Sequence, residues 1–290
     1  MELLVTLRKK HQLERLASLV DGIIIGGYFS SGFHYTSDDF EEIYKYCKQH
    51  NLKFYIVIDN FITENDKMLL YEYFDYIDSM DIDGIYFHDL GIYDVAKSYD
   101  MVSKLIYDGK TVLCNSLDTA FMLDKGINSV VLSRELTLQE ISAIVKNNPN
   151  HVDLQIFGHL KMSYSKRRFL TNYFKEIKKD YDYLSKESLY LVEEQRDYKM
   201  PIIEDEYGTS IYTDYIFEMF SEISDLQPYL KRGIVDTLFI EDDSRIYQVC
   251  RDYRRITSQN KEFLKESLYH NYPDVYSSGY LYQKTNISKE

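Results

Sequence analysis

Residues 151–174 read HVDLQIFGHLKMSYSKRRFLTNYF, and this stretch carries both a fold signal and a charge signal. Its first part, Val152–Phe157, is largely apolar, follows Asn-Pro-Asn-His and precedes Gly158, which predicts a short buried strand. The second part is basic, with seven Lys or Arg residues and one acid between Lys161 and Lys179. This window therefore carries +6 in a chain of −13, which leaves −19 for the remainder. A cationic loop after a buried strand indicates an anion-binding site, although a solvated basic helix start would have the same pattern.

The same unit, an apolar strand followed by an amphipathic helix, recurs along the chain. We expect strands at residues 3–7, 21–27, 53–59, 84–89, 104–107, 129–133 and 152–157. Helices are expected near 11–19, 40–47, 64–79, 115–123 and 137–145, with helix caps at 36–39. Each connection is long enough for successive strands to pair in parallel.

Seven such units predict an eighth, and the apolar run at 236–241 has the character of a strand. The expected fold is therefore an α/β TIM-like (β/α)8 barrel with an insertion between strands 7 and 8. Residues 1–174 would hold strands 1–7, residues 175–230 a helical insertion, and residues 231–290 strand 8 and C-terminal helices. An open doubly wound sheet is the alternative, but the chain has no Gly-x-Gly-x-x-Gly turn.

Composition narrows the class of protein. With 290 residues and 44% hydrophobic content, the chain can bury a sizeable core, and no apolar run reaches the length of a membrane span. The amino terminus lacks a signal-peptide pattern, and the three cysteines are far apart, so we expect a cytoplasmic protein with reduced thiols. A net charge of −13 disfavours broad nucleic-acid affinity, which requires several phosphate contacts.

In a barrel of this kind the working face lies at the carboxyl ends of the strands. The residues expected to face a substrate there, or in the loop after strand 7, are His88, Asp89, Asn115, Arg134, Glu135, His159, Tyr164 and Arg167. Asp59, Asn60 and Glu241 also follow strand ends. Lys161, Lys166 and Arg168 are candidate contacts to nucleic acid or another anion.

Several of these residues have a structural alternative. Asp89 could orient His88 as a base, or it could cap the next helix. Arg134 could clamp a carboxylate through its guanidinium fork, or it could form a local ion pair with Glu135. His159 could help hold an anion or be structural. No Gly-x-Ser-x-Gly elbow, His-Glu-x-x-His pair or paired-cysteine motif indicates a peptidase nucleophile or a zinc site.

The central stretch resembles the signature of the peptidase U32 family, in which valine-His-Gly-Ala-Leu-Cys leads into Tyr-Ser-Gly-Arg-Cys-Leu-Leu-Ser. The residues that match in register are Gly158, Leu160, Tyr164, Ser165, Arg167 and Leu170. Shorter similarities follow in the family's order, at residues 26–27, 36–40, 88–91, 130–136, 201–208 and 233–241. The two family cysteines of this signature fall on Lys161 and Arg168.

The resemblance implies a TIM-like barrel and two kinds of activity. Some members are labelled collagenase-like proteases; others hydroxylate RNA bases or quinone precursors with an iron–sulfur cluster held by four cysteines. Members that act on RNA are linked to prephenate as a hydroxyl source. Because residues 172–198 also contain no cysteine, this chain is similar to a short member without the cluster, and we expect no cofactor.

Short members of this kind are associated with a longer four-cysteine paralogue in 5-hydroxylation of wobble uridine in tRNA. The resemblance therefore implies an accessory subunit that works with such a paralogue, contacts tRNA through that partner, and recognises a small carboxylate such as prephenate at the barrel mouth. A U32-type peptidase and a non-catalytic scaffold barrel are the alternatives.

Overall fold

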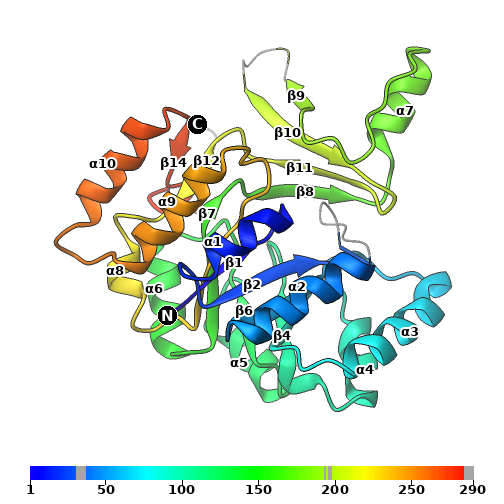
Figure 1. The fold of residues 1–290 in the computed structure, drawn as a ribbon, viewed down its shortest axis with the longest axis horizontal. Coiled ribbons are helices and arrows are strands. Elements are labelled where there is room, and N and C mark those ends of the chain that lie inside the picture. Colours follow the sequence, from blue (N-terminus) through cyan, green and yellow to red (C-terminus); the bar gives the residue numbers. More distant parts are fainter. Residues whose placement is uncertain (31–36, 193, 195–197, 284–290) are drawn as a thin grey trace.

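Eight parallel strands close into a barrel in the computed structural model, which describes residues 1–30, 37–192, 194 and 198–283 (Figure 1). The barrel closes because the last strand pairs with both the first and the seventh. The predicted TIM-like barrel is therefore confirmed. Its strands are β1 (Glu2–Thr6), β2 (Gly22–Gly26), β3 (Lys53–Ile58), β4 (Gly84–Phe87), β5 (Leu105–Asp108), β6 (Ser129–Val131), β7 (Val152–Gly158) and β13 (Arg232–Val235).

The position predicted for the eighth strand was wrong. Residues 236–241 form the loop after β13, in which Phe239 has a left-handed backbone with φ of 66°. Leu238 and Ile240 of this loop are buried without pairing in the sheet, which is why the run looked like a strand. Arg232 and Gly233, which precede the predicted run, begin the true strand. A Cβ on Gly233 would lie 2.9 Å from the Ile156 side chain, so a glycine lets β13 pack against β7.

Alternate residues of the strands face the barrel interior and the surrounding helices. Leu3 and Val5 of β1, for example, belong to the outer core under the helices, whereas Leu4 between them points inward. Nearly every strand contributes one apolar residue to the interior cluster, as expected for a packed barrel. The members of this cluster are Leu4, Ile24, Tyr55, Tyr86, Ile106, Val131 and Ile234.

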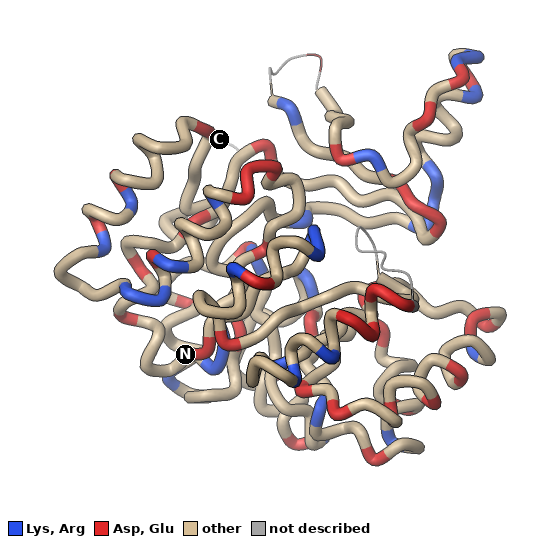
Figure 2. The backbone as a smooth tube through the Cα atoms, in the orientation of Figure 1, with Lys and Arg blue, Asp and Glu red and all other residues tan. Residues whose placement is uncertain are grey.

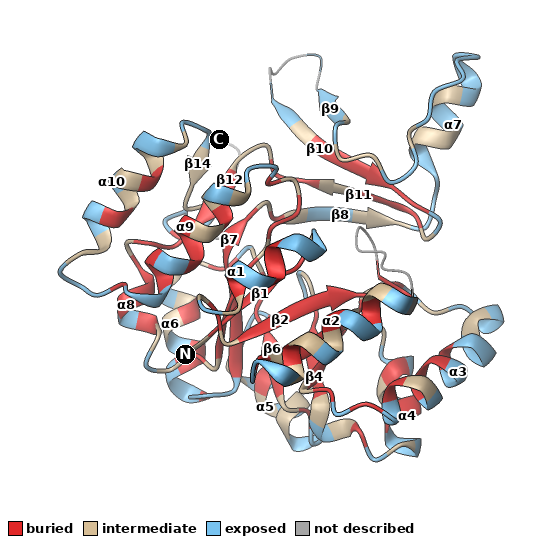
Figure 3. Cartoon of the chain, in the orientation of Figure 1, coloured by how far each residue is buried: buried red, intermediate tan, exposed pale blue. Residues whose placement is uncertain are grey.

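A ring of helices covers the outside of the barrel, with buried residues toward the strands and exposed residues outward (Figure 3). Thr137 opens one of them with a capping box to Glu140. Thr36, at the start of the predicted cap region, lies outside the described residues. Within the described chain no helix combines the length and apolarity needed to cross a membrane. The helices are α1 (Leu13–Leu16), α2 (Ser37–Gln49), α3 (Lys67–Asp78), α4 (Gly91–Ser98), α5 (Ser116–Asp124), α6 (Leu138–Asn147), α9 (Asp243–Arg254) and α10 (Lys261–Asn271).

The segment between β7 and β13 leaves the barrel and forms a small antiparallel sheet of order β8-β11-β10-β9. This sheet, with the helix α7, projects from one end of the barrel and is called the arm below (Figure 1). The segment starts at β8, earlier than the expected 175, and holds more strand than helix, whereas we expected helix. Its elements are β8 (Lys161–Ser165), α7 (Phe169–Glu176), β9 (Tyr190–Val192), β10 (Lys199–Glu204), β11 (Thr209–Tyr212), β12 (Ile216–Glu218) and α8 (Ile223–Leu226).

A buried carboxylate joins α7 to the small sheet. Glu204 of β10 accepts hydrogen bonds from the backbone N–H groups of Leu170 and Thr171 at 2.7 and 3.1 Å, and from the Thr209 hydroxyl at 2.8 Å. A carboxylate on the first N–H groups of a helix satisfies donors that have no partner within the helix.

On the other side of the barrel end, β12 pairs antiparallel with β7 and parallel with β14 (Tyr276–Ser277).

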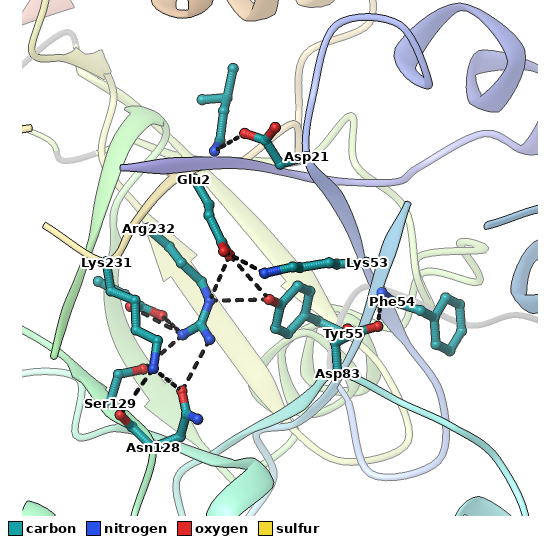
Figure 4. Close-up of polar contacts among 12 residues, drawn as sticks. Glu2, Asp21, Lys53, Phe54, Tyr55, Asp83, Asn128, Ser129, Lys231 and Arg232 are labelled. Atoms are coloured by element: carbon teal, nitrogen blue, oxygen red, sulfur yellow. Dashed lines mark hydrogen bonds and ion pairs between the residues drawn. The ribbon is translucent and has the colours of Figure 1, made fainter. Parts of the chain in front are cut away.

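The amino-terminal end of the barrel is closed by an arginine inside it (Figure 4). The Arg232 guanidinium donates to the Asp153 carboxylate at 3.0 Å, the Ser129 hydroxyl at 2.8 Å and the Tyr55 hydroxyl at 3.2 Å. Asp153 is fully buried, and Tyr86 donates a further hydrogen bond to it at 3.0 Å. This network fills the end opposite to the one where barrel enzymes carry their active sites, so we assign it a structural role.

Candidate functional site

The opposite, carboxyl end of the barrel contains a cavity of about 90 Å³. Strand ends and the loops after them supply its floor, and β8 and β11 of the arm supply one wall. Charged side chains of both signs converge there from six different segments, which is the usual construction of an active site in this fold. The ionisable and polar lining residues are Thr6, Asp59, Tyr86, Asp108, Lys110, Arg134, Gln155, Lys161, Tyr212 and Asp236.

Arg134 is fixed in this cavity by a carboxylate and an amide. Its two terminal nitrogens donate to the two Asp108 carboxylate oxygens at 3.4 and 3.2 Å, and its Nε donates to the Gln155 side chain at 3.1 Å. Burial alone would raise the pKa of Asp108, but the adjacent Arg134 and Lys110 outweigh it and hold that pKa well below its usual range. Asp108 is therefore ionised at neutral pH.

Lys161, which stands at the position of a family cysteine, points into the same cavity. Its Nζ donates to the Asp59 carboxylate at 2.8 Å, and it lies 5.8 Å from the centre of the Tyr212 ring. Burial would lower the pKa of Lys161, but Asp59 raises it above its usual value, so this lysine stays protonated. It thus acts as an internal ion-pair partner and is not a solvent-exposed cation.

Lys110 is the third cation of the cavity. Its Nζ lies 2.7 Å from the Asp108 carboxylate and 3.8 Å from the Asp59 carboxylate. Its pKa is lowered, first by burial and then by the neighbouring charges of Lys161 and Arg134, although both carboxylates act against this. The three cations and two of the carboxylates therefore form one connected network.

An aromatic and histidine rim adjoins the charged cavity. The Phe61 ring contacts both His88 and Tyr164, with centroids 4.9 and 5.6 Å apart. His88 makes a ring-nitrogen hydrogen bond of 3.1 Å with the Asp108 carbonyl, and burial followed by the charge of Lys110 lowers the pKa of His88. The Tyr164 hydroxyl lies 3.0 Å from the Tyr207 carbonyl, to which it donates. Predicted site residues Arg134, Lys161, His88 and Tyr164 are thus brought together.

Other predicted site residues have local structural roles. Asp89 accepts from the backbone of Ile62 and Gly91, and Asn115 caps α5 by accepting from the N–H groups of residues 117 and 118. His159 is hydrogen-bonded to the Thr213 carbonyl at 2.7 Å and packs on Phe239. Glu135 is exposed and does not line the cavity.

The remaining predicted cations lie at the turn between β8 and α7, where Figure 2 shows basic residues. Arg167 is exposed, Lys166 lies 3.9 Å from the Asp66 carboxylate, and Arg168 donates to the Glu206 carbonyl at 3.3 Å. These side chains belong to the surface of the arm and not to the cavity.

Asp108, Lys110, Gln155, Tyr212 and Asp236 were absent from the predicted site. For Asp108 the signal existed, because it directly follows the expected fifth strand at 104–107. For Gln155 a second signal existed, because a polar residue in the middle of an apolar strand must find a partner inside the barrel. Tyr212 could not be found in this way, since the arm that carries it was expected to be helical.

The cysteines do not gather at this site. Cys47 and Cys250 are buried in the outer helices α2 and α9, and Cys114 is exposed in the loop before α5. The described residues contain no cluster of three or more His, Cys, Asp or Glu side chains arranged to hold a metal ion. The cavity presents ammonium, guanidinium and carboxylate groups. These groups do not fit an iron–sulfur cluster, because such a cluster needs thiolate ligands.

Fold and site together define a class: a TIM-like barrel whose mouth holds a buried network of charges under a small antiparallel sheet. The family model for peptidase family U32 matches residues 28–289, and the chain belongs to this family. A solved U32 peptidase superposes with a TM-score of 0.51 at 12% identity, covering 81% of this chain and 92% of that one, which supports the shared fold.

Curated relatives carry two kinds of name. The tRNA hydroxylation protein P2 of Bacillus subtilis is 29% identical over 71% of this chain and 65% of its own length. An uncharacterised protease of Methanocaldococcus jannaschii is 31% identical over 48% of this chain and 35% of its own length. The tRNA hydroxylation protein P of Helicobacter pylori is 27% identical over 47% of this chain and 32% of its own length. The chain thus spans between about a third and two thirds of these proteins.

Proposed function

We propose that this chain is a cytoplasmic subunit in the hydroxylation of tRNA, acting at the wobble uridine. The observation that carries the proposal is the match, over 71% of this chain, to a relative named for tRNA hydroxylation. The chain has Lys161 and Arg168 where the family carries cysteines, so in this proposal it holds no iron–sulfur cluster. A longer four-cysteine U32 protein would supply the redox chemistry as its partner.

The proposed task of the barrel mouth is to bind a small carboxylate such as prephenate. Three cations, Lys110, Arg134 and Lys161, are 14–22% exposed there and pre-oriented by carboxylates and by Gln155. Charge-assisted hydrogen bonds to a ligand carboxylate are strong in such a site, because its low dielectric strengthens them and the donors need little reorganisation. The cavity is small compared with the ~300–1,000 Å³ of ordinary ligand pockets, so it would admit only a compact head group.

The proposed contact to tRNA or to the partner is the arm. Phe169 and Tyr173 of α7 and Ile177, which caps its C-terminus, are spaced four residues apart and are 43%, 58% and 38% exposed. Exposed aromatic side chains beside lysines and arginines can stack on bases while the cations contact phosphates. The arm shows this combination on an otherwise acidic chain, which fits local RNA contact shared with a partner.

The family name and the archaeal relative favour a second candidate, a peptidase. The described lining of the mouth cavity includes no serine, cysteine or histidine, so the nucleophile–base pairs of serine and cysteine peptidases are not assembled in it. Digestion of casein and gelatin across metals, inhibitors and pH separates this candidate from the first.

Nucleoside mass spectrometry of total tRNA from a strain lacking the gene tests the proposal. We expect loss of 5-oxygenated wobble uridines, restoration by the wild-type gene, and no restoration by Arg134→Gln. A variant of exposed Glu135, Glu135→Gln, is the matched control and should restore the modification. Unchanged tRNA in the deletion strain would overturn the proposal.

A further inference from the structure

Lys110 has an unusual backbone for a side chain of its kind. Two residues after β5 its φ is 57°, in the left-handed region that costs a non-glycine residue roughly 1–2 kcal/mol. Both its backbone N–H and its Nζ donate to the Asp108 carboxylate, at 3.1 and 2.7 Å. This conformation folds the side chain back into the barrel mouth, where it is 22% exposed. Strained backbone that aims one side chain into a cavity is common at functional sites.

Both carboxylates that Lys110 contacts also pair with a second cation. Arg134 already donates two hydrogen bonds to Asp108, and Lys161 donates to Asp59 at 2.8 Å, nearer than Lys110 at 3.8 Å. The other carboxylate of the lining, Asp236, accepts from the Thr6 hydroxyl and the Leu238 N–H. Asp108 and Asp59 therefore each keep one cation, Arg134 and Lys161, when Lys110 loses its proton.

We propose that Lys110 is an amine nucleophile that condenses with a small carbonyl compound bearing a carboxylate, such as a 2-keto acid. The neutral Nζ attacks the carbonyl carbon, a carbinolamine forms, and its hydroxyl leaves as water to give a protonated imine. The ammonium group of Lys110 releases one proton at the start, and the leaving hydroxyl takes up one proton to become water. The protons therefore balance, and no oxidant or reductant is consumed. Arg134 and Lys161 line the same cavity and would hold the carboxylate.

Two features of the cavity favour this chemistry over simple anion binding. A lysine that is buried beside other cations has its pKa lowered, which is how amine nucleophiles are activated in proteins. Lys161, by contrast, is held protonated by Asp59 and is suited only to binding. The inference rests on the proposed function in one respect, because both require a small carboxylate to bind at the barrel mouth.

Reductive trapping tests the inference. The full-length protein is incubated with pyruvate and cyanoborohydride, and peptides are mapped by mass spectrometry. Because the cavity would hold the keto acid beside Lys110, we expect about tenfold or more labelling at Lys110 than at exposed Lys166. Labelling at Lys110 should rise with pH as its amine deprotonates.

Variants distinguish a site from general reactivity. Lys110→Arg, and Lys110→Met as a second variant, should abolish the specific label, whereas Lys166→Arg should leave it unchanged. Circular dichroism of each variant establishes that the barrel is folded. Equal labelling of exposed lysines, or no label at Lys110 in wild type, would overturn the inference. If tRNA modification still depends on the gene in that case, the proposed function stands without the imine.

Discussion

The Asp108 carboxylate accepts hydrogen bonds from both terminal nitrogens of Arg134, at 3.4 and 3.2 Å, between the ends of the adjacent strands β5 and β6. Arg134 was expected to face a substrate carboxylate or to pair with its neighbour Glu135. Its partner is instead an internal carboxylate on another strand. A ligand must therefore share Arg134 with Asp108. Without a ligand the charges at the barrel mouth balance one another, and only a ligand that joins this network can bind there.

This pair has a consequence for stability against acid. The pKa of Asp108 is lower in the folded protein than the usual value near 3.9, because Arg134 and Lys110 outweigh burial. The unfolded chain therefore binds a proton that the folded chain does not, and this part of the stability is present at neutral pH and is lost as pH falls below about 5. In Arg134→Gln we expect about 3 kcal/mol lower unfolding free energy at pH 7.

The same variant should show a weaker loss of stability between pH 5 and 3, because the pKa of Asp108 moves toward its ordinary value. Urea titrations at several pH values measure both effects. Arg167→Gln, on the exposed turn of the arm, is the control and should follow the wild-type curve. An unchanged pH slope in Arg134→Gln would show that the pair does not set the pKa of Asp108.

A second prediction concerns the network at the other end of the barrel. Asp153 is fully buried and ion-paired with Arg232 at 3.0 Å, so Asp153→Ala leaves a charge without its partner. We expect a loss of about 3–5 kcal/mol in urea unfolding at pH 7. Glu41→Ala, which removes an exposed pair with Lys45, should cost less than about 1 kcal/mol. Equal costs for the two would contradict the structural role of the Arg232 network.

A third prediction concerns the end of β7. Gly158 has φ of 112°, and a Cβ there would lie 2.2 Å from the Asp236 carbonyl oxygen. Gly158→Ala must therefore move the loop that brings Asp236 to the cavity, and the strained φ alone costs of order 1–3 kcal/mol. Thermal unfolding should show a lowered Tm. Gly126→Ala is a control with positive φ but a nearest contact of 3.4 Å, and it should lower Tm less.

The barrel could be predicted because each strand–helix unit is specified by its own local pattern. The eighth strand could not, because Arg232 points into the barrel and breaks the apolar run that identifies a buried strand. At the mouth, Arg134 was predicted as a strand-end cation and Lys161 as an anion contact in the basic loop after strand 7. Asp108 ends β5, the strand next to β6, so its pairing with Arg134 needs only the order of neighbouring strands. The pairing of Lys161 with Asp59 joins segments that are distant in the chain, and that information is not local.

The last prediction separates the arm from the barrel. Tyr173 and Ile177 are 58% and 38% exposed, so Tyr173→Glu and Ile177→Glu place charge in solvent and should leave the unfolding free energy within about 0.5 kcal/mol of wild type. If α7 contacts tRNA or the partner, these variants should nevertheless fail to restore wobble-uridine modification in the deletion strain, because the negative charge repels phosphate and interrupts an apolar contact.

Phe263→Glu is the matched control for these variants, since Phe263 is 69% exposed on α10, away from the arm. It should restore the modification fully. Co-purification of the four-cysteine protein with each variant then identifies which contact was lost. Retained partner with absent modification would assign α7 to RNA, whereas loss of the partner would assign it to the protein interface. Full restoration by Tyr173→Glu and Ile177→Glu would exclude both roles and leave the mouth as the functional part of the chain.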